Sequence, residues 1–159
     1  MKHLYAISGR IVNFFIRPVW EKLANGKPRS RLLVVHQNEI LLVKNWISTQ
    51  HWRLPGGGVG RSETPLEAAV REIHEEVGLE IAQKQLKKLG RKDIRDGKAT
   101  IIAELYLLEV DSKSIAVNKA EIVDHGWFKI SQLPEDHDSV VDSAIAFYRG
   151  IVDNPEHST

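Results

Sequence analysis

One short segment constrains this chain more than any other part of its sequence. Thr64 and Glu67 form a capping box, Pro65 suits the first helical position, and Gly78 is a typical helix stop. Between these signals, apolar residues recur at helical spacing: Leu66, Ala69, Val70, Ile73 and Val77. The sequence therefore predicts a helix with a single apolar stripe, which would pack against a sheet.

The same segment carries three glutamates that a helix would stack together. Glu72, Glu75 and Glu76 stand at spacings i, i+3 and i+4, so their side chains are neighbours on the helix surface. Like charges at this spacing cost about 0.2–0.5 kcal/mol per pair. We expect the glutamates to face away from the core or along its edge and to bind a cation. The alternative is a solvated acidic face, the commonest place for charged residues on a surface helix.

Residues 57–79 resemble the Nudix box, in which a glycine is followed by five residues, a glutamate, seven residues and an Arg-Glu-aliphatic-x-Glu-Glu-x-Gly-aliphatic run. Residues 52–57, Trp-Arg-Leu-Pro-Gly-Gly, also resemble the stretch that precedes the box in this family. The fixed positions are filled without exception, by Gly57, Glu63, Arg71, Glu72, Ile73, Glu75, Glu76, Gly78 and Leu79.

The resemblance to the Nudix hydrolases, which include MutT-like proteins, implies a fold and a reaction. The implied fold is a three-layer α/β/α sandwich with a mixed β-sheet, in which the box helix lies against the sheet. The implied reaction is hydrolysis of the diphosphate linkage in a nucleoside diphosphate derivative. Carboxylates and glycine carbonyls offer hard oxygen ligands, which suit Mg²⁺ or Mn²⁺ and disfavour zinc.

By family position, Glu72, Glu75 and Glu76 are the implied metal ligands, and the Gly56 carbonyl completes the set. Arg71 and Glu63 are expected to pair and to brace the glycine loop rather than to contact substrate. Either Glu75 or Glu76 could also act on the attacking water, and which carboxylate deprotonates it stays open.

Glu121 is a further candidate, because it precedes Trp127 and Phe128 by the spacing at which the family often carries an extra acidic residue. It would be a metal ligand or the general base. The competing interpretation is an exposed glutamate at a strand edge.

Substrate recognition is less well marked in the sequence. Arg53 and Arg61 flank the glycine loop, where phosphates would pass, and three aromatic residues could stack on a base. Core aromatics and solvated arginines are the competing interpretations. Residues 84–98 are rich in lysine and arginine, so they could dock a polyphosphate or an RNA end, or form a solvated face. The aromatic candidates are Trp52, Tyr106 and Trp127.

The remaining elements follow from periodicity. Residues 32–35 and 40–43 predict a hairpin, and residues 98–110 and 124–130 predict two further strands. Residues 139–152 predict a helix. The side chains expected to face inward from this helix are Val140, Ala144, Phe147 and Ile151. Strands and helices mix without regular alternation, which favours a mixed sheet between helices.

The chain divides into an N-terminal part, residues 1–29, and a hydrolase domain, residues 30–159. The first part should contain an amphipathic helix, with a strand as the competing interpretation, followed by a linker at residues 25–30. That helix could cover the sheet or form a homodimer contact. Its apolar face consists of Leu4, Ile7, Ile11, Phe14 and Phe15.

Composition excludes several function classes. With 22 basic and 21 acidic residues the net charge is +1, so we expect neither nucleic acid nor a membrane as a partner. The absence of cysteine excludes a catalytic thiol and fits a cytoplasmic protein. It also disfavours an isomerase of the related isopentenyl type, for which the resemblance implies a cysteine. A non-catalytic Nudix-fold nucleotide-binding or regulatory module is the alternative to a hydrolase.

Overall fold

The structure is a computed structural model, and it describes residues 28–46, 51–96 and 99–153. The predicted N-terminal helix and the first residues of the predicted linker lie outside the described residues. The first strand already begins at Pro28, so residues 28–30 of that linker are strand. No helix within the described ranges is long and apolar enough to cross a membrane.

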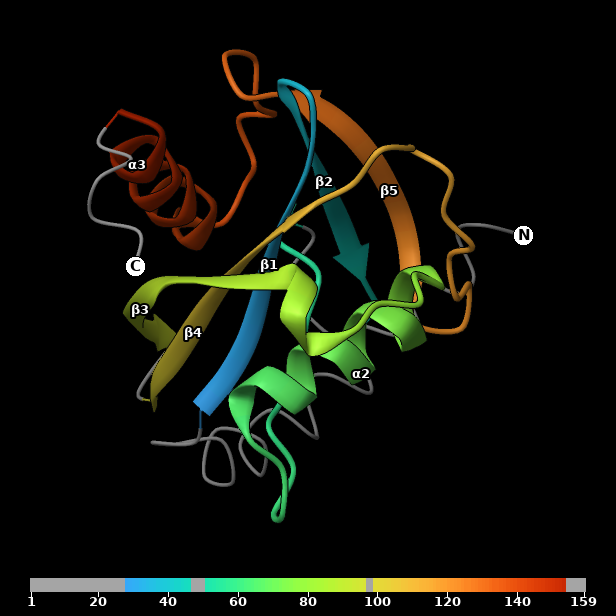
Figure 1. The fold of residues 1–159 in the computed structure, drawn as a ribbon, viewed down its shortest axis with the longest axis vertical. Helices are drawn as coiled ribbons and strands as arrows, with labels where there is room; N and C mark the ends of the chain where they lie inside the picture. The colour runs from blue at the N-terminus through green and yellow to red at the C-terminus, as the bar shows by residue number, and fades with distance from the viewer. Residues whose placement is uncertain (1–27, 47–50, 97–98, 154–159) are drawn as a thin grey trace.

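A five-stranded sheet in the order β3-β4-β1-β2-β5 forms the middle of the molecule (Figure 1). β1 runs parallel to β4, and the other three pairs of neighbours are antiparallel, so the predicted mixed sheet is confirmed. The strands are β1 (Pro28–His36), β2 (Glu39–Asn45), β3 (Leu86–Asp96), β4 (Ala99–Glu109) and β5 (Ile122–Lys129).

Within the described residues, one helix covers each face of the sheet, with α2 (Pro65–Val77) and α3 (Ser139–Asp153) on opposite sides (Figure 1). Alternation along β1 explains the two layers, because successive side chains of a strand point to opposite faces. Leu32 and Val34 join the apolar cluster beneath α2. Leu33 and Val35 join the cluster beneath α3. This is the three-layer α/β/α sandwich predicted from the sequence.

β1 and β2 separate after a short hairpin, and the glycine-rich segment before α2 enters between them. The hairpin register pairs Val35 with Ile40 and His36 with Glu39. Further along, the N–H groups of Ser30 and Leu32 in β1 donate to the carbonyls of Gly57 and Pro55, both at 2.9 Å. On the other side of the gap, Val43 of β2 exchanges two hydrogen bonds with Arg53, at 2.9 and 3.1 Å. The segment is therefore held by both strands.

Most of the predicted elements are confirmed, but two predictions need correction. The sequence marks residues 84–98 only as a basic stretch, whereas the structure forms strand β3 over Leu86–Asp96, preceded by the short 3₁₀ helix η1 (Gln83–Gln85). In α3, Phe147 was expected to face inward but is 38% exposed. The buried positions of this helix are Val140, Val141, Ala144 and Ile145, so its buried face is turned relative to the predicted one.

Candidate active site

Helix α2 begins and ends where the sequence predicts. The Thr64 hydroxyl accepts a hydrogen bond from the Glu67 N–H at 3.2 Å, and the Glu67 carboxylate accepts one from the Thr64 N–H at 2.8 Å. At the other end, Gly78 adopts a left-handed conformation with φ of 69° and donates to the His74 carbonyl at 3.0 Å. The apolar stripe docks α2 on the sheet, which fixes the direction in which its glutamates point.

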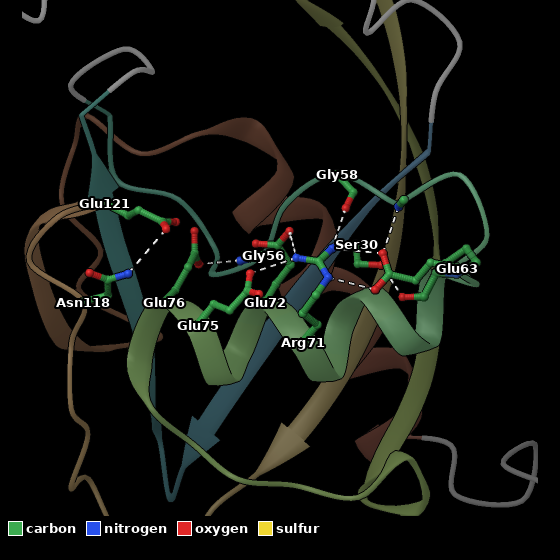
Figure 2. Close-up of polar contacts among 12 residues, drawn as sticks. Ser30, Gly56, Gly58, Glu63, Arg71, Glu72, Glu75, Glu76, Asn118 and Glu121 are labelled. Carbon is green, nitrogen blue, oxygen red and sulfur yellow. Dashed lines mark hydrogen bonds and ion pairs between the residues drawn. The ribbon is translucent and has the colours of Figure 1, made fainter.

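Arg71 is the hub of the polar contacts on α2 (Figure 2). Its Nε and Nη2 atoms bind the two oxygens of Glu63 at 2.8 and 2.9 Å, in a bidentate arrangement. Its Nη1 atom contacts Glu72 at 2.8 Å and Glu75 at 2.9 Å. Nη2 also donates to the Gly58 carbonyl at 3.0 Å. The predicted pair of Arg71 and Glu63 is confirmed, and Arg71 additionally neutralises two of the three stacked glutamates.

Glu63 connects Arg71 to the loop that precedes the helix. Its Oε2 atom accepts a hydrogen bond from the Gly60 N–H at 2.8 Å. The hydrogen bond from Arg71, assisted by that of Gly60, lowers the pKa of Glu63 below its ordinary value. The carboxylate therefore stays ionised, and the loop is braced from Gly58 to Glu63.

Glu76 differs from the other two glutamates, because it is only 2% exposed. Of the two expected orientations, away from the core or along its edge, the first is therefore wrong for this residue. Its Oε2 atom accepts a hydrogen bond from the Gly56 N–H at 2.8 Å, and its Oε1 atom accepts one from the Asn45 side-chain amide at 3.0 Å. Burial raises the pKa of Glu76, opposed by the Gly56 hydrogen bond and by the nearby positive charge of Arg31.

Two glycines of the loop, Gly56 and Gly57, allow other groups to pack closely against it. Gly56 has a φ of 125°, and a Cβ there would overlap the Ser30 carbonyl oxygen. A Cβ on Gly57 would overlap the carboxylate of Glu72. Gly58, in contrast, has nothing within 4 Å of the corresponding position. Gly57 therefore lets the Glu72 carboxylate lie directly against the loop backbone.

Glu121 lies beside the Glu76 end of the cluster, and Asn118 links the two (Figure 2). The Asn118 N–H donates to the Glu76 carbonyl at 2.9 Å, and its side-chain amide donates to Glu121 Oε1 at 3.3 Å. The Glu121 carbonyl accepts from the N–H of Trp46 at 3.1 Å. The fold thus brings Glu121 to the box helix, although Glu121 itself remains exposed.

Three residues that the sequence did not single out belong to this region: Arg31, Asn45 and Asn118. Arg31 is buried in β1, and its Nη1 atom donates to the carbonyl of Gly56. Asn45 ends β2 and, as described, binds Glu76. The sequence does offer one signal for Arg31, which stands directly before the apolar run from Leu32 to Val35. An arginine in a buried strand needs a specific partner, because this residue type is almost never fully buried unpaired.

The aromatic candidates lie in the apolar layers rather than among the carboxylates. Trp127 packs on the cluster beneath α2, with its ring edge-on to His36 at 6.2 Å. Trp127 of β5 pairs with Leu41 of β2. The β2 residue that contacts Glu76 is Asn45, at the end of that strand, so Trp127 lies away from the carboxylates. Trp52 packs on the opposite face of the sheet against Phe128, with ring centroids 4.8 Å apart. Tyr106 is also buried beneath α2.

The basic candidates do not gather in one place, and they differ in exposure. Arg53 lies 3.9 Å from the Asp138 carboxylate, and Arg61 is exposed in the turn before α2. In β3, Lys88 pairs with Glu104 of β4 at 2.9 Å, and Lys87 pairs with Glu109 of β4 at 3.4 Å. Arg91 lies 3.8 Å from Asp93 of the same strand. These pairs favour a solvated face for the basic stretch over a phosphate-docking surface.

The donor set fits a hard divalent cation in its chemistry. Glu72, Glu75 and Glu76 supply carboxylate oxygens from one side of a single helix, against a loop that allows close approach. Across the described residues, no three acidic or histidine side chains already converge as a metal-binding group. The reason is visible in the contacts, because Arg71 occupies the space between Glu72 and Glu75 and supplies the positive charge there.

Comparisons with known proteins agree with this geometry. The RNA pyrophosphohydrolase of Hydrogenovibrio crunogenus is 30% identical over 111 residues, which make up 69% of this chain. The matched part spans 61% of the length of that protein. The crystal structure of a MutT NUDIX hydrolase from Burkholderia pseudomallei is 26% identical with a TM-score of 0.68, covering 76% of this chain and 95% of the other.

A third similar protein is a bifunctional NMN adenylyltransferase/ADP ribose pyrophosphatase from Francisella tularensis, solved with AMP and a Mn ion. It is 20% identical with a TM-score of 0.62, covering 92% of this chain and 47% of the other, and this likeness concerns the fold alone. The family model of the NUDIX domain matches residues 26–148, which include every element of the sheet, helix α2 and the carboxylate cluster. This chain therefore belongs to the NUDIX domain family.

Proposed function

We propose that this protein is a metal-dependent pyrophosphohydrolase, which cleaves the diphosphate linkage of a nucleoside diphosphate derivative by attack of water on phosphorus. The observation that carries the proposal is the gathering of Glu72, Glu75, Glu76 and Glu121 at one end of a glycine loop braced by Arg71. A solvated acidic face would not explain why Glu76 is buried and hydrogen-bonded to the loop backbone.

The side chains of the cluster would have different tasks. Bound Mg²⁺ or Mn²⁺ would neutralise phosphate oxygens and lower the pKa of a coordinated water. Glu72, Glu75 and Glu76 would hold the ion together with the Gly56 carbonyl, which also accepts a hydrogen bond from Arg31. Arg71 would keep its bidentate pair with Glu63, so that the loop stays braced. The Mn ion in the Francisella structure supports this choice of metal.

The general base should be an exposed carboxylate. Both oxygens of Glu76 already accept hydrogen bonds, so this residue is poorly placed to take a proton from water. Glu121 is exposed, and within the described residues its side chain accepts a long hydrogen bond of 3.3 Å from Asn118. Glu121 is therefore our candidate for the base, and Glu75, with a side chain 47% exposed, is the second.

The alternative is a Nudix-fold module that binds nucleotides without cleaving them. Such a module would usually have lost a glutamate of the box, and all of them are present here. An isomerase of the isopentenyl type is disfavoured because the chain has no cysteine. The alternative nevertheless makes a distinct prediction, namely ligand binding with no product.

A substrate screen tests the proposal directly. The purified protein is incubated with Mg²⁺ and nucleoside triphosphates, oxidised nucleotides, ADP-ribose, dinucleoside polyphosphates or NADH, and the products are separated by ion-exchange chromatography. RNA with a 5′-terminal triphosphate joins the set because of the Hydrogenovibrio relative. We expect cleavage between two phosphorus atoms of at least one compound.

Two variants sharpen this screen. Glu121→Gln removes the candidate base and should lower kcat on the best substrate by about 10²–10⁴-fold. Glu109→Gln is the matched control, because Glu109, at the end of β4, is an exposed glutamate that pairs with Lys87 of β3 and should be dispensable. Binding of several compounds without any product, by wild type and variants alike, would favour the non-catalytic module.

A further inference from the structure

Arg31 is a buried cation outside the motif that defines the family. Its side chain is 7% exposed, and it lies in the first half of β1, directly before the apolar core of that strand. Burying a guanidinium is costly unless it makes specific polar contacts. Its contact is the carbonyl of Gly56, to which Nη1 donates a hydrogen bond.

The place of Gly56 in the fold explains why this contact matters. β1 donates to the carbonyls on either side of Gly56, through the N–H groups of Ser30 and Leu32. In an antiparallel pairing the intervening residue therefore directs its own N–H and C=O away from β1. β2 has separated from β1 at this level, so it cannot accept them as a regular neighbouring strand would.

Both polar groups of Gly56 are instead satisfied by charged side chains. The N–H donates to Glu76 Oε2 at 2.8 Å, and the C=O accepts from Arg31. Gly56 thus lies between a buried carboxylate and a buried guanidinium of opposite charge, and the guanidinium is close enough to attract the carboxylate electrostatically. Buried backbone groups without a partner would be costly, so removing either side chain should disturb the other.

We propose that Arg31 is a positioning residue of the active site: by holding the Gly56 carbonyl it fixes the loop and keeps the Gly56 N–H on the Glu76 carboxylate. This inference rests on the proposed function in that it takes Glu76 to act in the reaction. Arg31 itself contacts neither substrate nor metal in this role.

The first measurement is amide hydrogen exchange by NMR on the full chain after EDTA treatment. Arg31→Met removes the guanidinium but keeps an apolar stem, and Arg31→Lys keeps the charge with a different donor geometry. We expect exchange at Gly56 to accelerate by at least about tenfold in Arg31→Met and less in Arg31→Lys, because local opening changes without global unfolding. The amide of Leu42, in the core of β2, is the internal reference and should change little.

The second measurement is Mn²⁺ affinity, by titration calorimetry without substrate. Loss of a residue that orients a ligand typically weakens metal binding about 10–100-fold, and we expect this range for Arg31→Met. The matched control is Lys44→Met, which removes a half-buried positive charge that pairs with Asp136 and has no contact with Gly56. It should leave both the Gly56 exchange rate and the Mn²⁺ affinity unchanged.

Three results would overturn the proposal. The first is an unchanged rate of amide exchange at Gly56 in Arg31→Met. The second is equal acceleration of exchange at Gly56 and Leu42, which would indicate a merely structural role. An unchanged Mn²⁺ affinity with a raised KM is the third, since it would mean that Arg31 contacts substrate. If Arg31→Met does not fold, the same comparisons in Arg31→Lys decide. If wild type binds no Mn²⁺, the proposed function fails, whereas exchange at Gly56 still tests Arg31.

Discussion

Replacing Glu76 by glutamine and by alanine should separate its charge from its packing. Glu76→Ala removes the acceptor of the buried Gly56 N–H and that of the Asn45 amide. A buried donor left without a partner costs about 1–3 kcal/mol, so the melting temperature should fall by roughly 2–12 °C. Glu76→Gln can keep the Gly56 bond. The buried Asn45 Oδ1 atom, which has no hydrogen-bond partner in the described part of the chain, could accept from the new amide after Asn45 turns.

The charge of Glu76 should lower the stability of the folded protein, and this effect depends on pH. Burial raises the pKa of Glu76 in the folded state above its ordinary value of 4.5, so ionising it costs stability at neutral pH. In EDTA, Glu76→Gln should therefore match or exceed the melting temperature of wild type at neutral pH. That advantage should shrink as the pH falls through the raised pKa and vanish below 4.5, where Glu76 is protonated in both the folded and the unfolded state.

Metal binding and turnover should be lost in Glu76→Gln, although its stability without metal is kept or raised. Mg²⁺ should raise the melting temperature of wild type but not that of Glu76→Gln, because a ligand stabilises only the state that binds it. At saturating Mg²⁺, kcat of Glu76→Gln on the best substrate should fall by at least about 10². Differential scanning fluorimetry and steady-state kinetics measure both quantities. Near-wild-type turnover, or a Glu76→Gln protein as unstable as Glu76→Ala, would refute this account of the residue.

Three further predictions follow from the same contacts. Arg71→Ala should lower both melting temperature and activity, since it leaves Glu63 unpaired beside like charges; an unchanged melting temperature would indicate a substrate contact instead. Chelation with EDTA should abolish turnover, and Ca²⁺ should restore little of it because its geometry is loose; full activity in EDTA would exclude the mechanism. Gly57→Ala should weaken Mn²⁺ binding by displacing the Glu72 carboxylate, whereas Gly58→Ala should not, and calorimetry of the pair distinguishes them.

The layers of the fold were predictable because local signals agreed with the global arrangement. The box helix was bounded by a capping box and a glycine, and alternation in β1 placed side chains on two faces. β3 was missed because its lysines and arginines hide a strand pattern, and their pairing with acids on β4 appears only once the sheet is assembled. Propensity is a weak guide at such an edge strand, since its environment decides.

Within the site, the motif predicted which residues meet but not how they differ. The pair of Arg71 and Glu63 followed from the resemblance and is confirmed. The burial of Glu76 could not be inferred, because it depends on β2 ending at Asn45 and on the glycine loop filling the gap beside β1. For the same reason Arg31 escaped notice, since its partner is a backbone carbonyl 25 residues away in sequence.

The three stacked glutamates are therefore held by two separate sources of positive charge. Glu72 and Glu75 are neutralised by Arg71, which sits on the exposed side of α2 and is tied to the loop through Glu63. Glu76 is held instead by backbone and amide donors, with Arg31 behind them. A divalent ion would have to compete with Arg71 for Glu72 and Glu75, but at Glu76 it would meet a carboxylate whose ionisation burial disfavours. Binding the ion would relieve that cost, so the folded protein would gain stability from the metal.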